Sequence, residues 1–213
     1  MSERTTIHLV RHGEVFNPEK LLYGRLPGYR LSELGEAMAE RVSQHFADRD
    51  VTHLVASPLQ RAQQTAEPLA VLRGLDVHFD ANLLEATNVF EGKRVSVGDG
   101  VLRMPSAWRH LYNPFRPSWG EPYVDVAARM RIAIADARLA ARGHEAVLVS
   151  HQLPIWIARL DAEQRRFWHD PRSRECSLAS VTSLIFDGDV LSNVSYAEPC
   201  ADLVARSNKG VGA

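Results

Sequence analysis

The sequence has few cysteines and no long apolar run, and both shortages argue against whole classes of protein. Its two cysteines, Cys176 and Cys200, lack metal-ligand spacing, and a chain of this length needs no disulfide framework. No apolar run approaches the roughly 20 residues of a membrane-spanning helix, and residues 1–6 are polar rather than signal-like. We therefore expect a cytoplasmic protein with two reduced thiols and no membrane partner.

The chain also has almost no net charge. Its formal charge is -1 at pH 7, which provides no overall attraction to nucleic acid or to an anionic membrane. We expect no nucleic-acid partner, and any positive field must come from locally clustered arginines.

What is present is the composition of a globular protein. Hydrophobic residues make up 45% and charged residues 24% of the 213 positions, which is ordinary for a soluble domain. The length favours one large α/β domain, assigned to residues 1–200. The small and polar residues 201–213 are expected to form a flexible tail.

Hydrophobic periodicity predicts alternating strands and helices. The predicted strands cover 7–10, 53–56, 77–79 and 146–149, followed by a hairpin of 181–186 and 190–196. The predicted helices cover 33–48, 58–73, 124–142 and 154–167. Ser32 and Ser57 are expected to cap the first two helices. Residues 88–122 are rich in proline and aromatic residues, and we interpret them as a cap over the ligand crevice.

Reactive or charged side chains follow four of these strands. Arg11 and His12 follow the first strand, Arg61 lies in the helical turn after the second, Glu85 comes after the third, and His151 follows the fourth. The carboxyl ends of parallel strands border one crevice, so these groups should meet there. Two guanidinium groups, two imidazoles and one carboxylate are typical of a phosphate pocket with an acid beside it.

Phosphoryl-transfer chemistry assigns a role to each group. Fixed positive donors stabilise the charge of the transition state, which suits Arg11, Arg61 and His151. The neighbouring Arg11 disfavours a second positive charge on His12, so its imidazole stays neutral and can attack phosphorus. Glu85 would protonate the leaving oxygen and later accept a proton from water.

Two histidines and a glutamate could instead bind zinc. Two nearby arginines would repel a cation, and the closely spaced His or Cys pairs of common zinc motifs are absent from the sequence. We therefore expect no metal site.

Taken together, these motifs resemble the histidine phosphatase superfamily, also described as phosphoglycerate mutase-like. The matching stretches are Leu9-Val10-Arg11-His12-Gly13-Glu14, Gly24-Arg25, Leu31-Ser32-Glu33-Leu34-Gly35, Ser57-Pro58-Leu59-Gln60-Arg61-Ala62-Gln63-Gln64-Thr65-Ala66, Leu84-Glu85, Phe90-Glu91-Gly92 and Val149-Ser150-His151. The resemblance implies a three-layer α/β/α sandwich with a mostly parallel sheet and no cofactor or metal. It implies the same roles for the five residues above and adds Asn17 as a phosphate contact.

The chain departs from this family at three places. Val15 stands where a Ser or Thr is common, and Pro122 replaces the serine of a Gly-Glu-Ser stretch. Gln152 and Leu153 replace two glycines after the second histidine, so a phosphate contact from the backbone N–H of Gln152 is retained as an expectation. None of these changes removes a catalytic group.

The family resemblance leaves three activities open. True mutases typically have an arginine and an aromatic residue directly after the acid glutamate, whereas this chain has Ala86, Thr87 and Asn88. We therefore favour a phosphatase over a phosphoglycerate mutase, and both over a phospho-ligand-binding protein without activity. The expected partner is a small phosphorylated substrate, such as a sugar phosphate or a nucleotide. The oligomeric state stays open, with a homodimer as one alternative.

Overall fold

The computed structural model describes residues 3–94 and 120–207. A six-stranded mixed sheet lies in the centre, in the order β3-β2-β4-β1-β5-β6. The strands are β1 (Arg4–Arg11), β2 (Val51–Ala56), β3 (Val77–Phe79), β4 (Glu145–Ser150), β5 (Val181–Asp187) and β6 (Val190–Ala197). The first four strands run parallel, and the β5–β6 hairpin adds to β1 in antiparallel fashion. All predicted strands, including the hairpin, are confirmed.

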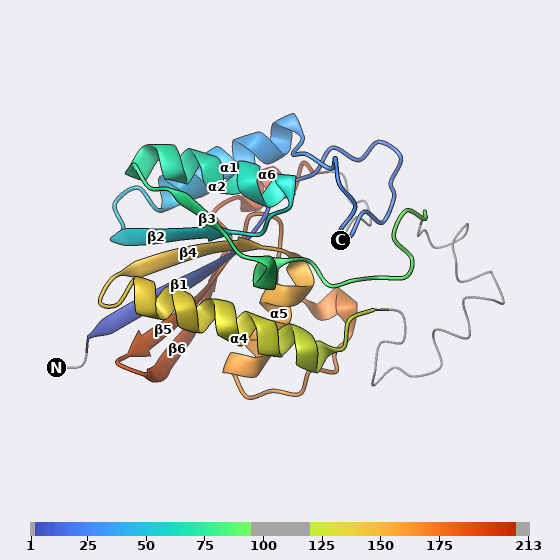
Figure 1. Ribbon diagram of the computed structural model, residues 1–213. Helices are drawn as coiled ribbons and strands as arrows, with labels where there is room; N and C mark the ends of the chain where they lie inside the picture. The colour runs from blue at the N-terminus through green and yellow to red at the C-terminus, as the bar shows by residue number, and fades with distance from the viewer. Residues whose placement is uncertain (1–2, 95–119, 208–213) are drawn as a thin grey trace.

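Helices cover both faces of this sheet (Figure 1). The helices α1 (Glu33–His45), α2 (Gln60–Arg73) and α6 (Ala201–Val204) lie on one face, and α4 (Tyr123–Ala140) and α5 (Gln152–Ala162) lie on the other. Short 3-10 turns, η1 (Ala81–Leu83) and η3 (Pro171–Ser173), complete the described elements. The predicted three-layer α/β/α sandwich is confirmed.

Strand alternation divides the apolar residues between two cores. On β4, Ala146 and Leu148 belong to the core under α4 and α5, whereas Val147 and Val149 belong to the core under α1 and α2. Successive side chains of a strand point to opposite faces, so a strand covered on both sides is apolar at every position. This explains why the central strands read as continuous apolar runs.

Several helix boundaries differ from the sequence-based expectation: α1 ends at His45 rather than at residue 48, and the differences at α2 and α5 bear on the site. The helix α2 begins at Gln60 with Leu59 as its cap, and the Ser57 hydroxyl lies before it, 2.8 Å from His151 Nε2 and accepting the Leu59 N–H at 3.4 Å. The helix α5 begins at Gln152 and stops at Ala162, short of the predicted residue 167. There the chain leaves the helix through Gln164, which has a positive φ of 54°. The Ser32 cap is confirmed, since its side chain accepts the Gly35 N–H.

Two peripheral segments were expected to be a flexible tail and a cap over the crevice. The tail expected from residue 201 begins instead with α6, whose Leu203 is buried in the core under α1 and α2. The cap expected over 88–122 falls mostly outside the described residues, although Asn88 and Gly120 form a β-bridge at its base. In the part of the chain that the structure describes, no helix is both long and apolar enough to cross a membrane.

Candidate active site

The structure brings the five predicted polar residues together at the carboxyl edge of the parallel strands. His12 and His151 are fully buried, and Arg61, Glu85 and Arg11 are exposed by only 1%, 4% and 9%. The rings of His12 and His151 lie 5.1 Å apart between centroids. Ionisable groups are rarely buried without a functional or structural reason, so this cluster is the strongest site candidate in the fold.

A close backbone contact shapes the turn that carries His12. A Cβ atom on Gly13 would lie 2.6 Å from the Gly35 carbonyl oxygen, so a side chain there would clash with backbone. The Gly13 N–H donates to the Thr65 hydroxyl at 3.1 Å. The turn after β1 is thereby packed against the start of α1 and tied to α2.

Hydrogen bonds define which nitrogen of His12 carries its proton. The Nδ1 atom lies 2.7 Å from the Gly13 carbonyl oxygen, which can only accept, so Nδ1 is the protonated nitrogen. The Nε2 lone pair then accepts from Arg61 Nε at 3.3 Å. Burial, with help from Arg61 and Arg11, holds the pKa of His12 well below its ordinary value. At neutral pH His12 is therefore uncharged, and its unprotonated Nε2 faces Arg61.

The two arginines are held by carbonyl oxygens. Arg61 donates to the Gly24 carbonyl at 2.7 Å and lies over the Tyr23 ring, 4.8 Å from its centroid. Arg11 donates through one terminal nitrogen to the Cys176 carbonyl at 2.7 Å, while its buried Nε has no hydrogen-bond partner among the described residues. Both guanidinium groups thus keep their positive charge available for an anion.

His151 and Glu85 each present one unsatisfied polar atom. His151 binds Ser57 through Nε2, and its buried Nδ1 has no partner in the described part of the chain. Glu85 accepts the Ala86 N–H through Oε1 at 2.8 Å, and its Oε2 is buried without a described partner. Burial raises the pKa of Glu85 above its ordinary value, which favours a protonated carboxyl group. A buried acid of this kind can donate a proton to a leaving oxygen.

An ion-pair network that the sequence analysis missed holds the backbone around Glu85. Arg25 donates to the Glu85 carbonyl, and Arg129 donates to the Asn82 carbonyl. Glu121 joins the two arginines, at 2.9 Å from Arg25 and 2.8 Å from Arg129. Arg129 sits on a helix predicted from its apolar face, and no sequence signal distinguished it from an exposed arginine.

Two further predicted contacts have a different position in the structure. The Asn17 side chain bonds both the N–H and the carbonyl of Leu21, so it closes the loop on itself. Gln152 is the first residue of α5, and its backbone N–H has no acceptor within the helix. Phosphate contacts from Asn17 and Gln152 stay predictions.

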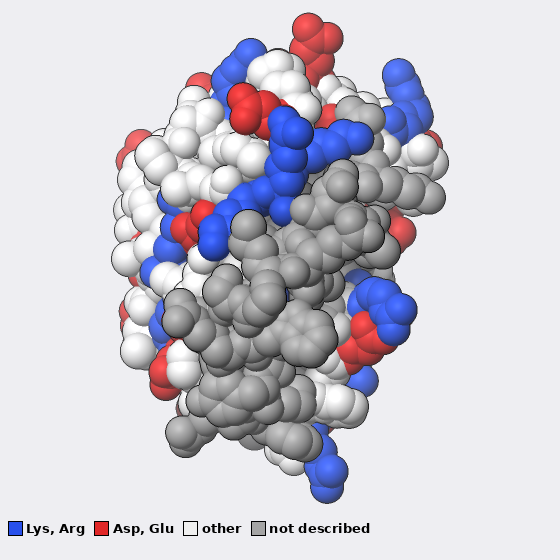
Figure 2. Space-filling model, turned by 90° about the vertical axis from the view of Figure 1, so that its right-hand side faces the viewer, with Lys and Arg blue, Asp and Glu red and all other residues white. Residues whose placement is uncertain are grey.

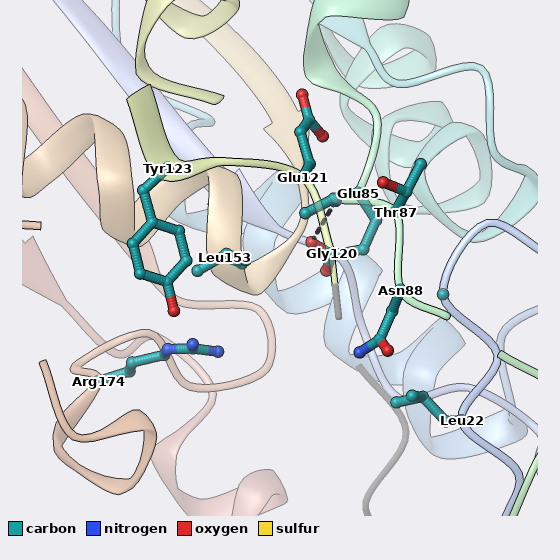
Figure 3. Close-up of a pocket in the computed structure, with 11 residues that line it drawn as sticks. Leu22, Glu85, Thr87, Asn88, Gly120, Glu121, Tyr123, Leu153 and Arg174 are labelled. Atoms are coloured by element: carbon teal, nitrogen blue, oxygen red, sulfur yellow. Dashed lines mark hydrogen bonds between the residues drawn. The ribbon is translucent and has the colours of Figure 1, made fainter. Parts of the chain in front are cut away.

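A pocket opens next to Glu85, on the side of the expected cap (Figure 3). Its lining includes Glu85, Asn88, Tyr123, Leu153 and Arg174. On the side of the molecule that lies to the right in Figure 1, lysines and arginines gather in the upper part of the surface (Figure 2). Within residues 3–94 and 120–207, no group of three or more His, Cys, Asp or Glu side chains is placed to hold a metal ion.

The fold and these residues define a recognisable class of protein. The family model for the histidine phosphatase superfamily (branch 1) matches residues 7–199, and the chain belongs to this family.

The chain is also similar to individual named proteins and to solved structures. The chain is 57% identical over 201 residues to the uncharacterised Mycobacterium tuberculosis protein Rv0525, covering 94% of this chain and all of that one. It is 32% identical over 187 residues to a probable phosphoglycerate mutase, GpmB, from Enterobacter, covering 82% and 83% of the two chains. Among solved structures, Bacillus stearothermophilus YhfR is 26% identical with a TM-score of 0.74, over 88% of this chain and 94% of that one. A mycobacterial glucosyl-3-phosphoglycerate phosphatase in complex with VO3 is 26% identical with a TM-score of 0.69, over 84% and 90%.

Proposed function

We propose that the protein is a phosphatase that hydrolyses a small phosphomonoester through a phosphohistidine at Nε2 of His12. The observation that carries this proposal is the fixed tautomer of His12, whose Nε2 lone pair faces Arg61. A phosphoryl group attacked by this lone pair is necessarily placed against a guanidinium group. A cytoplasmic location and activity without a metal or cofactor belong to the same proposal.

In the first step, Nε2 of His12 forms a bond to phosphorus while the bond from phosphorus to the ester oxygen breaks. Glu85 transfers its proton to that oxygen, so the alcohol leaves neutral. Arg11, Arg61 and His151 stabilise the negative charge on the three remaining oxygens. The imidazole ring becomes positive, and its Nδ1–H stays bound to the Gly13 carbonyl.

In the second step, water attacks phosphorus and the bond between phosphorus and Nε2 breaks. Glu85, now a carboxylate, takes one proton from this water. Inorganic phosphate leaves, and His12 and Glu85 return to their starting protonation states. Every atom in this cycle comes from the substrate, water and groups already present in the site.

Hydrolysis is favoured over mutase activity by the wall of the pocket next to Glu85. Ala86, Thr87 and Asn88, which directly follow Glu85, carry neither a positive charge nor an aromatic ring, although Tyr123 and Arg174 line the pocket from other segments. A mutase must also protect its phosphohistidine from water. Mutase activity stays the second candidate because a relative at 32% identity is described as a probable phosphoglycerate mutase.

Trapping the intermediate tests the proposal directly. Rapid quench with labelled substrate should yield an acid-labile, base-stable adduct, and His12→Ala should yield none. Turnover should also survive chelators. An acid-stable adduct, or full activity of His12→Ala, would contradict the proposal.

Two assays separate the alternatives. With 3-phosphoglycerate and a bisphosphoglycerate primer, a phosphatase releases inorganic phosphate faster than it forms 2-phosphoglycerate, and the reverse result would identify a mutase. A phospho-ligand-binding protein without activity would fail to hydrolyse even a generic aryl phosphate.

A further inference from the structure

Arg174 has an unusual electrostatic position in the pocket. It follows η3, and its guanidinium group points into the pocket, past the Tyr123 hydroxyl and toward the side that carries Asn88 (Figure 3). The same pocket is lined by Glu85, the proposed acid. Arg174 is therefore placed where the alcohol part of a substrate would lie.

Neutral groups hold this guanidinium. Its Nε donates to His169 Nε2 at 2.8 Å, and His169 Nδ1 in turn donates to the Phe167 carbonyl at 2.6 Å, which fixes a neutral imidazole. Its Nη1 lies 3.5 Å from Gln152 Oε1, and Tyr123 supplies a further side-chain hydrogen bond. These contacts orient the guanidinium plane without neutralising its charge.

Carboxylates near the pocket have other partners or other roles. Glu121 is bound by both Arg25 and Arg129. Glu85 is the proposed proton donor, and its raised pKa favours the uncharged form. Arg174 forms no salt bridge with any residue in the described part of the chain. Burial lowers the pKa of Arg174, against the opposing effects of Tyr123 and Glu85, because a partly desolvated cation is less stable than one in water.

We propose that Arg174 binds a second anionic group on the substrate, so that the preferred substrates are phosphomonoesters whose alcohol carries a carboxylate or a further phosphate. This inference rests on the proposed function, because it assigns the alcohol side of the same site. The planar guanidinium matches the two oxygens of such a group, and the Tyr123 hydroxyl can donate to one of them. Arg174 is thus a specificity residue of the reaction.

A matched pair of substrates tests this assignment. Glycerol 3-phosphate and 3-phosphoglycerate differ only by a CH₂OH group in place of a carboxylate. Wild-type protein should have a higher kcat/KM on 3-phosphoglycerate. Arg174→Gln should lower that value roughly 10- to 100-fold, mainly through KM, because a hydrogen bond to a charged group is lost. Glycerol 3-phosphate should change less than threefold, and Arg174→Lys should restore part of the loss.

One control variant and a second pair of substrates complete the test. Arg172→Gln removes an exposed arginine two residues away, which is paired with Asp170, and should leave both substrates unchanged. Fructose 1,6-bisphosphate and fructose 6-phosphate form the second pair and differ by one phosphate group. The pair that loses its preference in Arg174→Gln identifies the second anion as a phosphate or as a carboxylate.

The possible outcomes distinguish the role of Arg174 from the phosphatase activity itself. Equal losses on both members of each pair, or no preference in the wild type, would overturn the role of Arg174 while hydrolysis stands. Calorimetric binding of the same esters gives a readout that needs no turnover. Selective binding of 3-phosphoglycerate that depends on Arg174, without hydrolysis of any ester, would overturn the phosphatase proposal and leave the anion site in place.

Discussion

Arg129 binds both carboxylate oxygens of Glu121, at 2.8 and 3.1 Å, while its third nitrogen donates to the Asn82 carbonyl. With Arg25 on the Glu85 carbonyl, one guanidinium group binds each end of the segment from Asn82 to Glu85. A bidentate pair fixes orientation as well as distance. The network therefore positions Glu85 without touching the reacting atoms.

Arg129→Met should for this reason damage acid catalysis more than phosphate binding. We expect kcat on alkyl phosphates to fall roughly tenfold or more, because general acid catalysis contributes about 10²–10⁴-fold and depends on geometry. p-Nitrophenyl phosphate, whose leaving group needs little protonation, should be affected much less. Arg131→Gln, on the same helix and paired with Asp161 at the surface, is the matched control. Equal losses on both kinds of substrate would argue for a general structural role.

Ser57→Ala should impair activity, because the Ser57 hydroxyl holds Nε2 of His151. A hydrogen bond of this kind contributes about 0.5–1.5 kcal/mol, so kcat/KM should fall roughly 2- to 10-fold. Ser32→Ala removes a true cap, which costs about 1 kcal/mol of unfolding free energy, and should leave kcat/KM nearly unchanged. Urea unfolding and steady-state kinetics on both variants give the comparison. Unchanged activity in Ser57→Ala would contradict this role.

The two serines differ in how much of their role could be predicted from the sequence. Both precede an apolar helical pattern, and the pattern alone predicts a cap in each case. For Ser57 the helix begins later, at Gln60, and its hydroxyl binds His151, 94 residues further along the chain, as well as the Leu59 N–H. A contact between segments so distant in the chain leaves no local signal.

The buried site residues could be predicted from the sequence, whereas two arginines near them could not. Arg11, His12 and His151 were predictable because each directly follows an apolar strand, and parallel strands bring such positions to one edge. Arg129 and Arg174 were missed, since each looks locally like an ordinary surface arginine. Their environments depend on partners at Glu121 and His169, which only the folded chain supplies.

At the amino end of the central strand β4, Glu145 should contribute to stability in a way that depends on pH. It binds Arg49 at 2.7 Å and the buried His8 at 3.0 Å, and these contacts lower its pKa to about 2 against the opposing effect of its partial burial. Because the folded-state pKa lies below the ordinary value of 4.5, the stabilisation is complete above pH 4.5 and is lost as pH falls toward 2.

Glu145→Gln should therefore lower the unfolding free energy near pH 7 by about 1–2 kcal/mol, after allowance for solvent screening. The difference from wild type should shrink between pH 4.5 and 2, as measured by urea unfolding at several pH values. Asp202→Asn, which removes an exposed surface pair with Arg41, should change stability little at any pH. A constant difference between wild type and Glu145→Gln would show that the contribution is not ionic.

Substrates with different leaving groups can show whether Glu85 is a general acid or a buried carboxyl group without a catalytic role. An alkoxide leaving from a sugar or glycerol phosphate is strongly basic and needs a proton in the transition state, whereas p-nitrophenolate leaves readily without one. Glu85→Gln should slow phosphorylation of His12 by alkyl phosphates by about 10²–10⁴-fold, and should slow p-nitrophenyl phosphate much less. Gln preserves the acceptor for the Ala86 N–H, so the local backbone keeps its contact.

Single-turnover measurement of the phosphorylation step is needed for this comparison, because Glu85 is also proposed to assist water in dephosphorylation. At steady state a slow second step would hide the contrast between leaving groups. Equal losses for the two substrates would remove Glu85 from the role of leaving-group acid. The next candidate would then be Glu14, which follows His12 by two residues and accepts the Ser32 hydroxyl at 2.6 Å.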